Sequence, residues 1–76
     1  MFIYKFDVLK ALSAKGYTST VIRNNKLLGQ STLTKIRNNE SITLQSLNDI
    51  CIMLNCQPSD VIEITETPEE TERFML

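Results

Sequence analysis

Apolar residues recur at helical spacing between residues 44 and 54, and this amphipathic stripe is the clearest structural signal in the sequence. Its members are Leu44, Leu47, Ile50 or Cys51, and Leu54. Residues three or four apart lie on one face of an α-helix, so the stripe predicts a helix with one buried side. A chain of 76 residues buries only about 60% of the surface that its unfolded form exposes, so one economical core is expected.

Turn and capping residues predict shorter helices on both sides of this segment. Gly16 and Asn39 suit the left-handed conformation that follows a helix, and Thr18 suits an N-cap. Either Ser41 or Thr43 is expected to cap the amphipathic helix. The shorter helices are expected over residues 6–15, 19–25, 30–38 and 58–61. The predicted fold class is therefore all-α, as a compact bundle of four to five short helices.

The two ends of the chain differ in character from this bundle. Residues 61–65 are rich in β-branched side chains and predict a strand that pairs with residues 1–5, within one chain or across a dimer. Residues 65–76 are rich in Glu and Thr and predict a flexible acidic tail. The expected organisation is one domain over residues 1–64, followed by the tail.

Charge is distributed unevenly along the chain. Residues 1–43 contain seven Lys and Arg side chains and two acidic ones, whereas residues 44–76 contain one Arg and seven acidic side chains. The net charge of −1 therefore hides a basic first half that attracts a polyanion, because a phosphate responds to the local field. Segregated surface charge without nucleic-acid binding explains the same pattern equally well.

The residues that usually carry catalysis or metal binding are scarce. The chain has no His, and its two thiols, Cys51 and Cys56, are five residues apart and lack other soft ligands. We interpret both as buried hydrophobic side chains. Without paired carboxylates or a Gly-rich phosphate loop, the sequence predicts no enzyme, no metal, no cofactor and no small-molecule ligand.

Membrane insertion and secretion are not expected. The longest apolar run, residues 50–54, is far shorter than the ~20 residues of a spanning helix. Lys5, Asp7 and Lys10 interrupt the apolar stretch near the start, so no signal peptide is predicted. The expected compartment is the cytoplasm.

The two predicted helices 19–25 and 30–38 are joined by about four residues, which is typical of a helix-turn-helix. In that motif the second helix enters the major groove of DNA with its N-terminal residues leading. Leu33 and Ile36 give this helix one core face. Its other residues are then free to contact bases.

Four polar residues lie opposite or beside this core face, and we predict that they contact bases: Gln30, Ser31, Thr34 and Lys35. Gln pairs with adenine through two hydrogen bonds, and Lys donates to the guanine acceptors. Ser and Thr serve either type of base.

Residues that flank this helix suit contacts to phosphates. Thr18 and Ser19 lie at the start of the predicted helix 19–25, where free backbone N–H groups favour an anion. A second group lies at the end of 30–38 or just after it and consists of Arg37, Asn38, Asn39, Ser41 and Thr43. Such contacts set the register of the protein on DNA, whereas 30–38 sets sequence preference. A helical bundle that uses these polar residues only for solubility is the competing interpretation.

The sequence also resembles a known family. The segments GYTS (16–19), GQSTLTKIRNN (29–39), TLQSLNDIC (43–51) and LNCQPSD (54–60) are similar to an Xre-type helix-turn-helix domain, the Cro/CI or lambda repressor-like family. The resemblance covers residues 6–64. It implies a lambda repressor-like bundle of four or five helices that binds DNA sequence-specifically, usually as a dimer, and regulates transcription.

The resemblance places the base-reading positions on the four residues named above and the phosphate contacts on Ser19 and residues 38–41. Three positions depart from the family pattern. Arg23 stands where a small residue is usual, Leu27 where Gly is usual, and Ser19 where Gln commonly opens the helix. Arg23 either alters the packing of the two helices or itself reaches a phosphate.

Two functions follow as hypotheses. The preferred one is a transcriptional regulator that binds double-stranded DNA as a homodimer, through residues 30–38 in the major groove. The alternative is a protein-interaction module, antitoxin-like or an adaptor, that acts through its acidic C-terminal segment.

Overall fold

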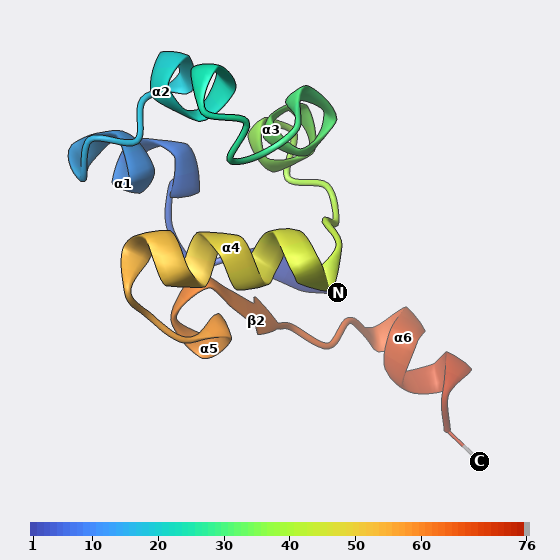
Figure 1. The fold of residues 1–76 in the computed structure, drawn as a ribbon. Coiled ribbons are helices and arrows are strands. Elements are labelled where there is room, and N and C mark those ends of the chain that lie inside the picture. Colours follow the sequence, from blue (N-terminus) through green and yellow to red (C-terminus); the bar gives the residue numbers. More distant parts are fainter. Residues whose placement is uncertain (76) are drawn as a thin grey trace.

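The computed structural model describes residues 1–75, which form six helices and a two-stranded antiparallel sheet. In chain order the elements are β1 (Phe2–Tyr4), α1 (Val8–Ala14), α2 (Ser19–Asn24), α3 (Gln30–Arg37), α4 (Leu44–Leu54), α5 (Pro58–Val61), β2 (Ile62–Ile64) and α6 (Pro68–Arg73). Figure 1 shows α1, α2 and α3 on one side of α4, and α5 and β2 on the other. The predicted all-α bundle with a small terminal β pairing is confirmed.

One hydrophobic core joins helices α1 to α5. Among the described residues its buried members are Val8, Leu12, Ile22, Leu28, Leu33, Ile36, Leu47, Ile50, Cys51, Leu54 and Val61. Helix α4 contributes four of them and lies in the middle of the molecule, as its amphipathic stripe predicted. Each of the first three helices contributes at least one, so the core fixes the position of α2 and α3.

The first residue of the predicted stripe does not belong to the core. Leu44 is 83% exposed, so the prediction that it faces inward is wrong. Leu44 borders two open surface hollows, and the buried Leu47 also lines both of them. A periodic sequence pattern places Leu44 on the correct side of the helix, but it does not show where the packed neighbours end.

Four helices end in a left-handed residue whose backbone N–H groups bond back to the last turn. Gly16 ends α1, Asn39 ends α3 and Asn55 ends α4, as Gly and Asn commonly do. At the end of α2 the left-handed residue is Lys26, with φ of 53°. Leu27, where the family resemblance placed a usual glycine, follows this residue, and its N–H bonds to the Ile22 carbonyl oxygen at 2.9 Å.

The two strands pair within one chain, which decides between the alternatives left open by the sequence. Phe2 lies opposite Ile64, and Tyr4 lies opposite Ile62. The Tyr4 hydroxyl donates a hydrogen bond of 2.6 Å to the carbonyl oxygen of Glu40. The sheet therefore also holds the loop between α3 and α4.

Within residues 65–76 the structure contains a helix that the sequence did not predict. The Thr67 hydroxyl accepts from the Glu70 backbone, and the Glu70 carboxylate accepts from Thr67, so α6 begins with a capping box. The α-amino group of Met1 also donates to the Glu70 carboxylate at 2.7 Å. These hydrogen bonds lower the pKa of Glu70, and the bond from the amino group has the largest effect.

Helix α6 buries none of its side chains and extends away from the other helices (Figure 1). That this acidic segment is flexible and separate from the domain remains a prediction. The last residue of the predicted tail, Leu76, lies outside the described residues.

The two cysteines are free thiols. Cys51 is buried in the core, and this burial raises the pKa of its thiol. The neighbouring Cys56 raises it further, by a smaller effect. None of the helices in residues 1–75 is long and apolar enough to cross a membrane.

Two isoleucines of α4 test the assignment of the core. Ile50 is fully buried and Ile52, two residues further, is 72% exposed. We expect Ile50→Ala to lower the free energy of unfolding by about 2–5 kcal/mol, because it removes buried methyl groups and leaves a cavity. Ile52→Ala should change it by less than about 0.5 kcal/mol. Urea unfolding followed by circular dichroism measures both, and Ile50→Val serves if the alanine variant does not fold. Equal effects at the two positions would contradict this core.

Candidate nucleic-acid interface

Helices α2 and α3 are held at a fixed angle by apolar side chains from both helices and from the connector between them. Ile22 of α2, Leu28 of the connector, and Leu33 of α3 are all buried in the common core. The Thr18 hydroxyl accepts from the Val21 backbone at 3.3 Å and caps the start of α2. These contacts form the helix-turn-helix that the spacing of the sequence predicted.

The exposed side of α3 carries all four predicted base-contacting residues. Leu33 and Ile36 face the core, and with about 100° between successive residues the opposite side carries Ser31, Thr34 and Lys35. Gln30 lies at the edge of this side, at the first turn, and it is also exposed. The structure therefore brings the four residues together on one accessible surface.

Hydrogen bonds within α3 define what each of these side chains offers to a ligand. The Thr34 hydroxyl donates to the Gln30 carbonyl oxygen at 3.0 Å, so it presents an acceptor and a methyl group. The side chains of Ser31 and Lys35 make no hydrogen bond to any other described residue. The surface of α3 thus offers donors, acceptors and one methyl group, which is the mixture that base edges in the major groove require.

The residues predicted to contact phosphates are also exposed, and except for Arg23, which is in the last turn of α2, they lie at the two ends of the helix-turn-helix. They are Thr18, Ser19, Arg23, Arg37, Asn38, Asn39 and Ser41. The Thr18 oxygen is used as a helix cap, which leaves its hydroxyl hydrogen free to donate. Residues 38–41 form the loop whose Glu40 carbonyl oxygen is held by Tyr4. The Asn38–Ser41 region is therefore anchored to β1.

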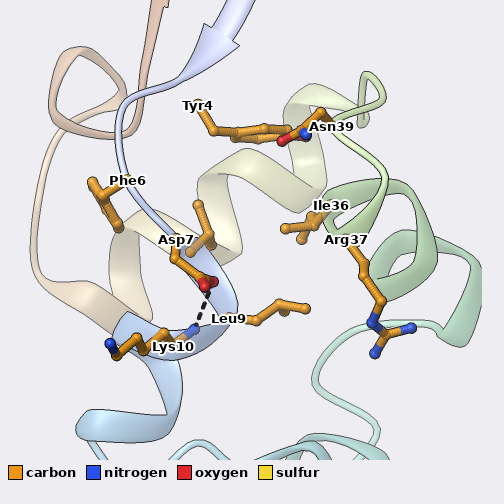
Figure 2. Close-up of a pocket in the computed structure, with 9 residues that line it drawn as sticks. Tyr4, Phe6, Asp7, Leu9, Lys10, Ile36, Arg37 and Asn39 are labelled. Atoms are coloured by element: carbon orange, nitrogen blue, oxygen red, sulfur yellow. Dashed lines mark hydrogen bonds between the residues drawn. The ribbon is translucent and has the colours of Figure 1, made fainter.

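An open cavity of about 660 Å³ lies between the end of α3 and the start of α1 (Figure 2). Its wall includes Arg37 and Asn39, two of the predicted phosphate contacts, and its Asp7 carboxylate is engaged as the cap of α1. In Figure 2 the charged ends of Lys10 and Arg37 point away from each other. The polar groups of this cavity do not converge on one ligand.

The charges of the chain separate in space as well as in sequence. Between Asp7 and Glu40 the chain has six Lys and Arg residues and no acidic residue, and this stretch forms α1, α2 and α3. Most acidic residues lie in α5, β2 and α6 and the segments that join them, at the other end of the molecule in Figure 1. The helix-turn-helix is therefore the end of the molecule that attracts a polyanion.

Sequence reasoning missed one cation of this surface. Lys26 is exposed in the connector, and together with Arg23 and Gln30 it lines a hollow at the start of α3. Its charge was counted in the basic half, but no sequence signal distinguished it from other surface lysines. Within residues 1–75 no cluster of three or more His, Cys, Asp or Glu side chains is placed to hold a metal ion.

The sequence matches the model of the Cro/C1-type HTH DNA-binding domain over residues 7–67. This chain belongs to the Cro/C1-type family. The match extends from the cap of α1 to the cap of α6 and includes the whole helix-turn-helix. DNA binding through a domain of this type, and the predicted likeness to Cro and CI, are thereby confirmed, and the family is normally non-enzymatic. Searches of curated proteins and of solved structures find no match.

The cap at the start of α2 in this Cro/C1-type domain is open to a direct test. We expect Thr18→Ala to lower the free energy of unfolding by about 1 kcal/mol, because the Val21 N–H loses its acceptor. Thr20→Ala is the matched control, since Thr20 lies in the same helix, is exposed, and makes no side-chain hydrogen bond to a described residue. Urea unfolding measures both variants. A Thr20→Ala loss as large as that of Thr18→Ala would refute the capping role.

Proposed function

We propose that this chain is a transcriptional regulator that recognises a specific DNA sequence by placing α3 in the major groove. The observation that carries the proposal is the two-sided character of α3. Leu33 and Ile36 fix one side in the core, while the other side presents the exposed polar side chains of Gln30, Ser31, Thr34 and Lys35. A helix of this kind meets the requirements for direct readout of base edges.

Each residue of the surface then has a stated role. Gln30 pairs with an adenine, Lys35 donates to a guanine, and Ser31 and Thr34 contact neighbouring bases or a thymine methyl group. Seven further exposed residues bind phosphates and set the register: Thr18, Ser19, Arg23, Arg37, Asn38, Asn39 and Ser41. The stretch between Asp7 and Glu40, which carries α1 to α3, supports this assignment, because its six Lys and Arg residues and the absence of acidic residues attract the DNA backbone.

We further infer that the regulator acts as a homodimer in the cytoplasm, without enzymatic activity, metal or cofactor. A two-fold dimer of helix-turn-helix domains binds a pseudo-palindrome whose half-sites are about 34 Å apart, one turn of B-DNA. The free thiols Cys51 and Cys56 agree with a reducing compartment.

To test the base contacts, preferred duplexes are selected from a random pool, and the affinity of each variant for them is measured. Gln30→Ala and Lys35→Ala should each weaken binding to the selected site by about 1–3 kcal/mol, with a smaller effect on unrelated DNA. Gln45→Ala and Lys10→Ala are matched controls on exposed positions of α4 and α1. If no motif is enriched, sequence-specific binding fails. If losses are equal on both DNAs, these residues contact the backbone instead.

A second function is favoured by the surface of the C-terminal segment. Phe74 and Met75 are 70% and 71% exposed, beside the acidic residues of α6. Exposed apolar side chains that directly follow an acidic helix are suited to a protein partner. The alternative proposal is therefore an interaction module, antitoxin-like or an adaptor, that uses α6.

Removal of residues 66–76 separates the two functions. We expect the shortened chain to bind its selected DNA site with affinity within about threefold of the full chain, because α6 buries no side chain and lies far from α3. Electrophoretic mobility shift measures this affinity. A large loss of DNA affinity would show that α6 contributes to the interface. Retained DNA binding with loss of a co-purifying partner would show that both functions exist.

A further inference from the structure

A small hollow of about 250 Å³ lies where the connector between α2 and α3 meets the first turn of α3. The apolar residues Leu28 and Leu33 contribute to its lining with Gly29, and two cations and one amide complete it: Arg23, Lys26 and Gln30. Gln30 is the residue that leads α3 into the groove in the proposed function. A ligand in this hollow is therefore adjacent to the first base contact.

The backbone of Lys26 has a left-handed conformation that lysine rarely adopts. Lys26 is the left-handed residue at the end of α2, where its N–H bonds to the Arg23 carbonyl oxygen at 3.2 Å and the next N–H bonds to Ile22. The other left-handed residues of the described chain are Gly or Asn, which adopt this conformation more readily. A strained backbone of this kind at a turn is a reason to seek a function for the side chain.

The charges at the hollow have no acidic partner in the part of the chain that the structure describes. Among residues 1–75 neither Lys26 nor Arg23 forms an ion pair, and the nearest acidic residues in sequence are Asp7 and Glu40. The hollow thus combines two unpaired cations with apolar carbon atoms. A sugar–phosphate unit of nucleic acid has the complementary chemistry, because its phosphodiester is anionic and its deoxyribose presents carbon atoms.

We propose that Lys26 binds a phosphodiester of the DNA backbone at this hollow, beside the base that Gln30 contacts. Arg23 supplies the second cation, and the deoxyribose lies over the hollow, where Leu28 and Leu33 are 7% and 3% exposed. This inference rests on the proposed function and adds to it a phosphate contact from the turn itself. The contact fixes the first turn of α3 relative to the DNA strand.

The experiment measures, for four variants of the full chain, how the affinity for the selected duplex depends on salt concentration. Lys26→Gln removes the charge and keeps a side chain of similar size at the left-handed position, whereas Lys26→Arg keeps the charge. Lys26→Gly removes both the charge and the backbone strain. Lys5→Gln is the control, since Lys5 is exposed, lies outside the helix-turn-helix, and donates to the Ser59 carbonyl oxygen of α5.

We expect the slope of log affinity against log salt to become shallower by about 0.9 for Lys26→Gln and Lys26→Gly, the value for one phosphate contact. Lys26→Arg and Lys5→Gln should keep the wild-type slope. The loss of affinity should be the same on the selected and on unrelated duplexes, because a phosphate contact carries no sequence information. In addition, Lys26→Gly should raise the unfolding midpoint by roughly 4–8 °C, since glycine relieves the left-handed strain.

The possible outcomes distinguish this inference from the function on which it rests. Wild-type protein that binds no duplex overturns both. Wild-type protein that selects a site, together with an unchanged slope for Lys26→Gln, overturns the phosphate contact alone. Loss that is confined to the selected duplex places Lys26 on a base and likewise overturns it. Ethylation of single phosphates gives an independent readout: one phosphate that interferes with wild-type binding should cease to matter for Lys26→Gln.

Discussion

The packing of α3 into the core through Leu33 and Ile36 is the interaction on which the proposed interface depends. Two buried side chains on an eight-residue helix fix its rotation, and so they determine which residues reach solvent. If α3 rotated by one residue, a leucine or isoleucine would meet the DNA and a polar side chain would enter the core. The orientation of α3 that the proposed interface requires is thus fixed by the packing of its buried side in the core.

A second constraint is electrostatic. The stretch that builds α1 to α3 has cations and no carboxylate, while the acidic residues collect toward α5, β2 and α6. The nearly neutral net charge of the chain therefore conceals a strong dipole along the molecule. Such a dipole orients the protein as it approaches DNA, because the basic end is attracted and the acidic end is repelled.

Local chemistry made much of this structure predictable from the sequence. Thr18 as a cap and Asn39 as a left-handed residue follow from side-chain properties that act over a single turn. The exposed polar side of α3 follows from helical periodicity, and the confirmed Cro/C1-type domain supports it. The assignment of base and phosphate contacts remains a proposal, because it depends on the DNA as well as on this chain.

What the sequence did not predict depends on neighbours that are remote along the chain. Leu44 is exposed because the core ends beneath it, which periodicity does not reveal. Helix α6 was missed because a Glu-rich composition outweighed the capping box at Thr67 and Glu70. Lys26 was treated as part of a loop, since its left-handed conformation is set by the way α2 ends rather than by any preference of lysine.

The strand pairing has a consequence for the dynamics of the loop after α3. Because Phe2 pairs with Ile64, the sheet closes nearly the entire chain into a ring, and such long-range contacts form late and open early. Each opening frees Tyr4 from the Glu40 carbonyl oxygen. Transient fraying at the chain ends is thereby transmitted to the loop that follows α3.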